Sequence, residues 1–207
     1  MQRKHVWTTI ILSIGFPTSV CAQADQSIEV REDDQLQKIA RETLEKFDLP
    51  GICVAVVEGD QLVRIAAAGV RKAGDRTPIT IEDKFHIGSC TKAMTATMIA
   101  CVVNQTDLTW ESTIAEVLPE LAKACHADYR DVTLRQLLDH RGGLPANSDH
   151  SSKRSRSLTQ QRHDVLAHAL AAEPRVKPGT KFEYSNLGYM LAGLMAETVA
   201  KQSWRDL

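Results

Sequence analysis

The chain has 207 residues, of which 43% are hydrophobic, 25% charged and 5% aromatic. This composition is ordinary for a globular protein and excludes disordered, collagen-like and coiled-coil classes. Lys and Arg number 25 against 26 Asp and Glu. Because a nucleic-acid binder usually has a clear basic excess, we expect no nucleic-acid partner.

Residues 1–24 have the three-part layout of a secretory signal peptide. Arg3 and Lys4 precede an apolar run over residues 6–20, and an A-x-A pattern ending at Ala24 follows. This layout predicts a secreted or periplasmic protein that is cleaved after Ala24. The alternative, a membrane anchor, needs about 20 apolar residues, and the run is shorter. We therefore expect no integral membrane segment after cleavage.

Four cysteines follow the predicted cleavage site: Cys53, Cys90, Cys101 and Cys125. Export to an oxidising compartment permits disulfides, and four cysteines allow three connectivities. Cys90 and Cys101 lie in one predicted helix, where 11 residues correspond to roughly 16 Å, which exceeds the reach of a disulfide. For at least these two we favour buried, free thiols.

The first half of the chain predicts a helix followed by a hairpin. Residues 33–47 have apolar side chains at helical spacing, and Pro50 ends the pattern. Residues 52–57 form a continuous apolar run typical of a buried strand, and residues 61–67 form the return strand. The two-residue Gly-Asp turn at 59–60 suits a hairpin.

The second half predicts helices. Residues 89–103 are apolar nearly all round, which favours a helix buried on most sides. Further helices are predicted over residues 113–118, 133–140, 164–172 and 186–201, and a polar, basic loop over residues 150–162. Because an isolated hairpin is marginally stable, we expect additional strands beyond Leu207 and interpret the chain as an incomplete copy of a larger fold.

Ser89 and Lys92 form an S-x-x-K pattern at the predicted start of a helix. Positions i and i+3 share a helix face, so the amine can reach the hydroxyl and act as its base. Backbone N–H groups at a helix start also stabilise negative charge on a bound carbonyl oxygen. The alternative is a lysine that extends from an apolar helix into solvent for no catalytic purpose.

Tyr184 and Asn186 lie at the predicted start of the last helix, after the Pro-Gly turn at 178–179. The phenol can relay a proton, and the amide offers a donor and an acceptor. The alternative is a buried tyrosine followed by an asparagine helix cap.

Together these motifs resemble the serine β-lactamase and penicillin-binding-protein family, with most similarity to the class C β-lactamase-like branch that includes D-amino-acid peptidases and esterases. The resemblance rests on GSCTK at 88–92, LLDHRGGLP at 137–145, PG at 178–179 and YSNLGY at 184–189, in this order. It implies an α+β fold with an antiparallel sheet flanked by helices and a mostly helical region. Residues 25–207 would be a partial domain, C-terminally incomplete, with only the first hairpin of the sheet.

The resemblance also implies an exported serine hydrolase that forms an acyl-enzyme with an amide, β-lactam or ester. Ser89 would be acylated, Lys92 would activate it, and Tyr184 would pass the proton to the leaving group. Asn186 would orient Lys92 and bind the substrate, a small molecule or a peptide. No cofactor and no metal are implied.

The chain departs from the family pattern in two places. No Lys- or His-containing triplet ending in Gly follows Asn186, and Arg141 replaces a small hydroxyl residue. The alternative function is therefore a truncated, non-catalytic relative that binds cell-wall peptides or a partner, or an inactive fragment. Other chemistry is weakly supported, because His163 and His168 are poorly spaced for zinc and Cys90 has no predicted basic partner.

Overall fold

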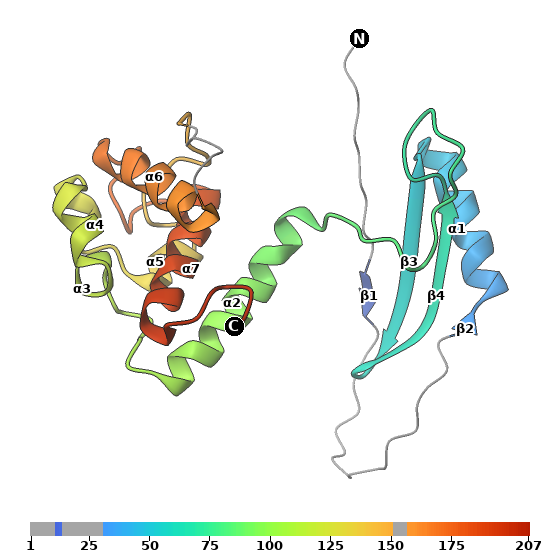
Figure 1. The fold of residues 1–207 in the computed structure, drawn as a ribbon, viewed down its shortest axis with the longest axis horizontal. Helices are drawn as coiled ribbons and strands as arrows, with labels where there is room; N and C mark the ends of the chain where they lie inside the picture. The colour runs from blue at the N-terminus through green and yellow to red at the C-terminus, as the bar shows by residue number, and fades with distance from the viewer. Residues whose placement is uncertain (1–10, 14–30, 151–156) are drawn as a thin grey trace. The chain divides into compact units, whose positions relative to one another are not determined.

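The computed structural model describes residues 11–13, 31–150 and 157–207. They fall into two compact units, which are described separately: a sheet unit that ends at Gly88 and a helical unit over Ser89–Leu207. Figure 1 shows the elements of each unit in chain order. Most of the predicted signal peptide lies outside the described residues.

The sheet unit is built on the predicted hairpin. Strands β3 (Gly51–Glu58) and β4 (Gln61–Gly69) pair antiparallel, with an irregularity between Val56 and Val57. Two short strands extend this hairpin: β1 (Ile11–Ser13) pairs parallel with β3, and β2 (Arg31–Glu32) pairs parallel with β4. The predicted hairpin is confirmed as the antiparallel part of this sheet, whose strand order is β1-β3-β4-β2.

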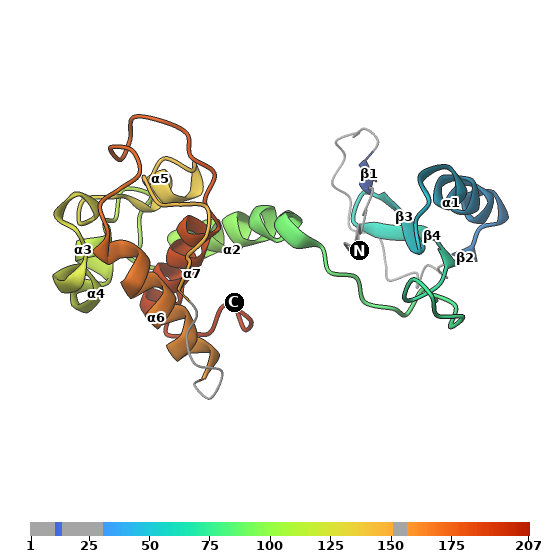
Figure 2. The ribbon, with the colours of Figure 1, turned by 90° about the horizontal axis from the view of Figure 1, so that it is seen from above.

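Helix α1 (Asp34–Phe47) packs beside the hairpin, as both views of the sheet unit show (Figure 1 and Figure 2). Asp33 caps the helix by accepting a hydrogen bond from the backbone N–H of Leu36. Ala40 is fully buried and packs with Ile52 of β3 and Ala68 of β4. The apolar stripe predicted from helical spacing therefore fixes which face of α1 meets the sheet.

The helical unit is organised around α7 (Asn186–Ala200), which contacts α2, α3, α5 and α6. Leu191, Met195 and Ala196 of α7 are fully buried in its core. The other helices are α2 (Thr91–Gln105), α3 (Ile114–Val117), α4 (Pro119–Ala124), α5 (Leu134–Leu138) and α6 (Leu158–Ala171). Short 3-10 turns cover Gly88–Cys90 and Ala127–Tyr129. Within the described ranges, no helix combines the length and apolar character that crossing a membrane requires.

One helix was not predicted, and one begins earlier than predicted. The helix predicted over residues 113–118 is present as α3, and Pro119 begins a further helix, α4, where the missing N–H of proline costs nothing. Helix α6 begins at Leu158 rather than at residue 164, because Ser157 caps it and Arg162 in its first half pairs with Glu197 of α7. The predicted polar loop is thus partly helical.

Two cysteines, one just before α2 and one on it, are exposed. The helix buries Thr95, Ile99 and Val102 within its unit, whereas Cys90 and Cys101 are exposed. Both thiols are free, as expected, but the prediction that they are buried is wrong. The near-uniform apolarity of α2 gave no sign of which side would be covered. Of the other two free cysteines, Cys125 is buried and Cys53 is half-buried.

Candidate active site

The start of α2 brings Ser89 and Lys92 together. Ser89 lies in the 3-10 turn that leads into α2, and Lys92 follows one turn later. The Lys92 Nζ atom lies 3.3 Å from Ser89 Oγ, within hydrogen-bond distance. Ser89 is exposed and Lys92 is half-buried, so the hydroxyl is accessible while the amine is partly shielded from water.

The start of α7 supplies the other two predicted residues. Tyr184 Oη lies 2.7 Å from Ser89 Oγ, and Lys92 Nζ donates a hydrogen bond of 2.6 Å to Asn186 Oδ1. Ser89 and Lys92 are thus joined to Tyr184 and Asn186, which lie more than 90 positions later in the sequence. The four side chains form one connected hydrogen-bond network. Tyr184 has an exposed fraction of 41%, so the network opens to solvent on the phenol side.

Ser185, rather than Asn186, caps α7. Its buried hydroxyl accepts a hydrogen bond from the Gly188 N–H at 3.0 Å and donates one to the Pro145 carbonyl at 2.7 Å. Because Ser185 satisfies the helix end, the side chain of Asn186 is available for Lys92. The alternative in which asparagine serves only as the helix cap does not describe this geometry.

Positive charge near the phenol favours its ionised form. Hydrogen bonding with Lys92, and then with Ser89, lowers the pKa of Tyr184 below its ordinary value. The Lys92 Nζ atom also lies 4.7 Å from the centre of the Tyr184 ring and 5.6 Å from that of Tyr189. Two aromatic rings thus flank the amine.

Two polar residues of the site were not singled out by the sequence. Asn147 Oδ1 accepts a hydrogen bond of 2.8 Å from Asn186 Nδ2, and the Ala146 carbonyl accepts one of 2.9 Å from the Asn186 N–H. His140 Nδ1 accepts a hydrogen bond of 3.1 Å from the Ser185 N–H. Both residues lie in or beside the HRGGLP segment, but their hydrogen-bond partners are about 40 positions away in the sequence. Contacts between such distant positions cannot be predicted from local sequence periodicity.

The histidines of α6 do not gather metal ligands. Among the described residues, no group of three or more His, Cys, Asp or Glu side chains is arranged to hold a metal ion. His168 Nε2 instead lies 3.2 Å from Asp149 Oδ1, and its ring stacks on that of His150 at a centroid distance of 4.7 Å. This contact ties the loop after Asn147 to α6.

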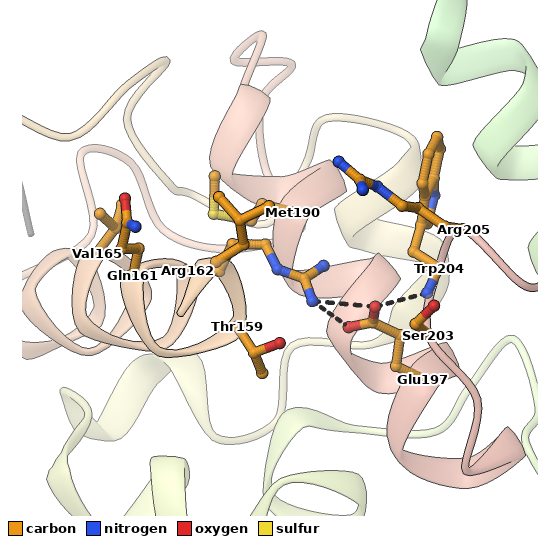
Figure 3. A pocket seen from close by; sticks show the side chains of 10 residues that line it. Thr159, Gln161, Arg162, Val165, Met190, Glu197, Ser203, Trp204 and Arg205 are labelled. Carbon is orange, nitrogen blue, oxygen red and sulfur yellow. Dashed lines mark hydrogen bonds and ion pairs between the residues drawn. The ribbon is translucent and has the colours of Figure 1, made fainter. Parts of the chain in front are cut away.

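A separate hollow of about 530 Å³ lies between α6, α7 and the segment after α7 (Figure 3). Arg162 donates to both carboxylate oxygens of Glu197, at 3.0 and 2.8 Å, and Glu197 also accepts from the Trp204 N–H at 2.6 Å. The charges of Arg162 and Glu197 therefore satisfy one another. None of the four network residues lines this hollow.

Comparison with known proteins identifies the family. The family model for beta-lactamase matches residues 36–207, which cover the whole helical unit and part of the sheet unit. The chain belongs to the beta-lactamase family. The resemblance inferred from the four motifs is confirmed, and so is the α+β, beta-lactamase-like fold.

Three relatives illustrate the range of this family. Protein flp of Staphylococcus aureus is 28% identical over 171 residues, covering 82% of this chain and 34% of the relative. Penicillin-binding protein 4 of Amycolatopsis lactamdurans is 31% identical over 170 residues, covering 78% and 43%. The structure of D-amino acid amidase from Ochrobactrum anthropi SV3, complexed with D-phenylalanine, is 25% identical with a TM-score of 0.63, covering 84% and 47%. The chain thus spans less than half the length of each.

Proposed function

We propose that this beta-lactamase family protein is an exported serine hydrolase that transfers the acyl group of an amide, β-lactam or ester to Ser89. The observation that carries the proposal is the position of the Ser89 hydroxyl, 2.7 Å from the Tyr184 phenol and 3.3 Å from the Lys92 amine. A serine hydroxyl is a weak nucleophile, and a neighbouring base makes it reactive. A hydrolase named for D-amino acid amides among the structural relatives supports an amide substrate.

Acylation follows from this geometry. Ser89 Oγ attacks the carbonyl carbon, and Lys92, acting as an amine base, takes the hydroxyl proton. Negative charge develops on the carbonyl oxygen, which the N–H groups at the start of α2 stabilise. When the C–N or C–O bond breaks, Tyr184 gives its phenol proton to the leaving group, and Lys92 returns the serine proton to the resulting phenolate.

Hydrolysis reverses these roles. A water molecule attacks the acyl carbon and gives up a proton to the Tyr184–Lys92 pair. The ester bond to Ser89 breaks, and Oγ recovers a proton from the same pair. The hydrogen bond of 2.6 Å from Lys92 to Asn186 holds the amine beside the serine throughout. A base role for Lys92 predicts a rate that rises from acid to neutral or alkaline pH, and a maximum below about pH 5 would contradict it.

Export is supported by the layout of residues 1–24, with Arg3 and Lys4, the apolar run and the A-x-A pattern ending at Ala24. The proposal places the protein in the periplasm or outside the cell. Amino-terminal sequencing of the mature protein tests it: a chain that begins at Ala24 or retains Met1 would contradict cleavage after Ala24.

Covalent labelling of the 207-residue chain tests the catalytic proposal. A fluorescent penicillin and a fluorophosphonate are each incubated with the folded protein, and the modified peptide is identified by mass spectrometry. We expect the label on Ser89 and its loss in Ser89→Ala. The matched control is Ser203→Ala, because Ser203 is also exposed but lies outside the network.

The two variants separate specific from incidental reaction. Labelling that persists in Ser89→Ala, or that is lost equally in Ser203→Ala, would refute the assignment of the nucleophile. Labelling that needs the folded state and Ser89 together supports it. The two probes also distinguish substrate classes, since only the penicillin tests for a β-lactam.

A further inference from the structure

His140 holds the backbone on both sides of Tyr184. It follows α5 with φ of 58°, in the left-handed region, which directs both its carbonyl and its side chain toward the segment before α7. The His140 carbonyl accepts a hydrogen bond of 2.7 Å from the Glu183 N–H. Its Nδ1 atom accepts a hydrogen bond of 3.1 Å from the Ser185 N–H. One residue therefore anchors the peptide groups before and after the phenol.

The imidazole ring also packs against aromatic rings of the site. Its centroid lies 4.5 Å from that of Tyr184 at an interplanar angle of 35°. Phe182 and Tyr189 lie at centroid distances of 5.4 and 5.2 Å. The side of the phenol ring that faces His140 is thereby supported, while its hydroxyl reaches Ser89.

We propose that His140 is a positioning residue that holds Tyr184 over Ser89, and that it does so as a neutral imidazole with the proton on Nε2. The proton assignment follows from the bond to Ser185: a backbone N–H can only donate, so Nδ1 must keep its lone pair. A proton on Nδ1 would turn this contact into two opposed donors. The positioning role rests on the proposed function of Tyr184, whereas the proton assignment does not.

The groups around the ring maintain its neutral state. Burial and the nearby Lys92 charge lower the pKa of His140, and the Asp139 charge opposes them. Tyr184 and Tyr189 face the ring from α7 and the segment before it. Because the phenol of Tyr184 is itself next to Lys92, protonated His140 would place a second cation beside the same phenol. Protonation of His140 at acid pH should therefore break its hydrogen bond with the Ser185 N–H and allow the Tyr184 phenol to move away from Ser89.

Nuclear magnetic resonance of the complete chain tests the proton assignment without any reaction. In protein with ¹⁵N-labelled imidazole groups, we expect His140 at neutral pH to carry its proton on Nε2 and to titrate at a lower pH than an ordinary imidazole. A proton on Nδ1, or a doubly protonated ring at neutral pH, would overturn the proposal. Because the measurement uses the unmodified protein, its result does not depend on whether a variant folds.

Two substitutions test positioning. His140→Asn keeps an acceptor and suits a left-handed backbone, whereas His140→Phe keeps the ring and loses the acceptor. We expect His140→Phe to label Ser89 about tenfold more slowly, because small misplacements of catalytic groups cost rate. His140→Asn should stay within about threefold of the parent and lose only that part of the acid-side fall in rate which protonation of His140 adds to protonation of Lys92. Equal labelling rates and unchanged pH profiles for both variants would overturn the proposal.

The matched control and a second readout separate this proposal from the proposed function. His126 Nδ1 also accepts a backbone N–H, from Asp128 at 3.3 Å, but lies outside the network, so His126→Asn should change nothing. Titration of the ¹³Cζ signal of Tyr184 reports its contact with Lys92 even if Ser89 is never acylated. We expect the pKa of Tyr184 to rise toward its ordinary value in His140→Phe and to stay lowered in His140→Asn and His126→Asn. An unchanged pKa of Tyr184 in His140→Phe would overturn the positioning role.

Discussion

Replacing Asn186 with leucine removes the group that holds Lys92 beside Ser89. The bond from Lys92 Nζ to Asn186 Oδ1 is 2.6 Å long and involves a charge, and such bonds contribute about 1.5–3 kcal/mol. Since Asn186 is only half-buried, we take the lower part of this range, about 1.5–2 kcal/mol. At about 1.36 kcal/mol per tenfold, Ser89 should be labelled about 10- to 30-fold more slowly.

Asn147→Ala provides a graded comparison. This change removes the neutral bond of 2.8 Å that orients the Asn186 amide, so the rate should fall by only about two- to tenfold. The double variant should be no slower than Asn186→Leu alone, because Asn147 acts through Asn186. Stopped-flow or gel-based labelling with a fluorophosphonate measures all three rates.

Asn104→Leu serves as the control for this series, since Asn104 is an exposed asparagine on α2. An Asn186→Leu rate within twofold of the parent, about 0.4 kcal/mol, would refute the view that this amide holds the lysine in place. Circular dichroism on each variant establishes that the compared proteins are folded.

Arg162→Met should lower the free energy of unfolding by about 1–3 kcal/mol in urea denaturation, because it leaves Glu197, which is mostly buried, without its bidentate partner; no loss would show that the pair is neutral to stability. Tyr129 is fully buried, and burial raises its pKa to about 12. The unfolded phenol loses its proton at lower pH than the folded one, so folding stability should fall above roughly pH 10 by up to about 2–3 kcal/mol, and Tyr129→Phe should fall less over the same range in thermal melts. Thr133→Ala removes the cap of α5, the helix that leads to His140, and should cost about 1 kcal/mol, whereas Thr133→Ser should recover most of it; equal stability of the three proteins would contradict the capping role.

The parts of the site that could be predicted are those set by short-range geometry. The pairing of Ser89 with Lys92 follows from helical spacing. Tyr184 and Asn186 were chosen through the family resemblance, because residue type alone favoured an ordinary helix cap. The hairpin was predictable because its turn and its apolar runs are contiguous.

What escaped prediction depends on contacts between distant segments. Packing against α7 determines which side of α2 is buried within the helical unit. The apolar sequence around Cys101 therefore did not reveal that this cysteine lies on an exposed face of α2. Arg162 lies inside α6 because Glu197 neutralises it from α7, although a basic residue in a polar stretch indicated a loop. The roles of His140 and Asn147 arise only when the chain folds back on α7.

Among the residues that the structure describes, the hydrogen bonds that connect Ser89, Lys92, Tyr184 and Asn186 join two distant segments of the helical unit. The start of α2 and the segment entering α7 each supply two of the four side chains, so a shift of either helix would separate Ser89 from Tyr184 and Lys92 from Asn186 at the same time. Substitutions on the buried face of α7 are therefore a route to altering the geometry around Ser89 without replacing any of the four residues.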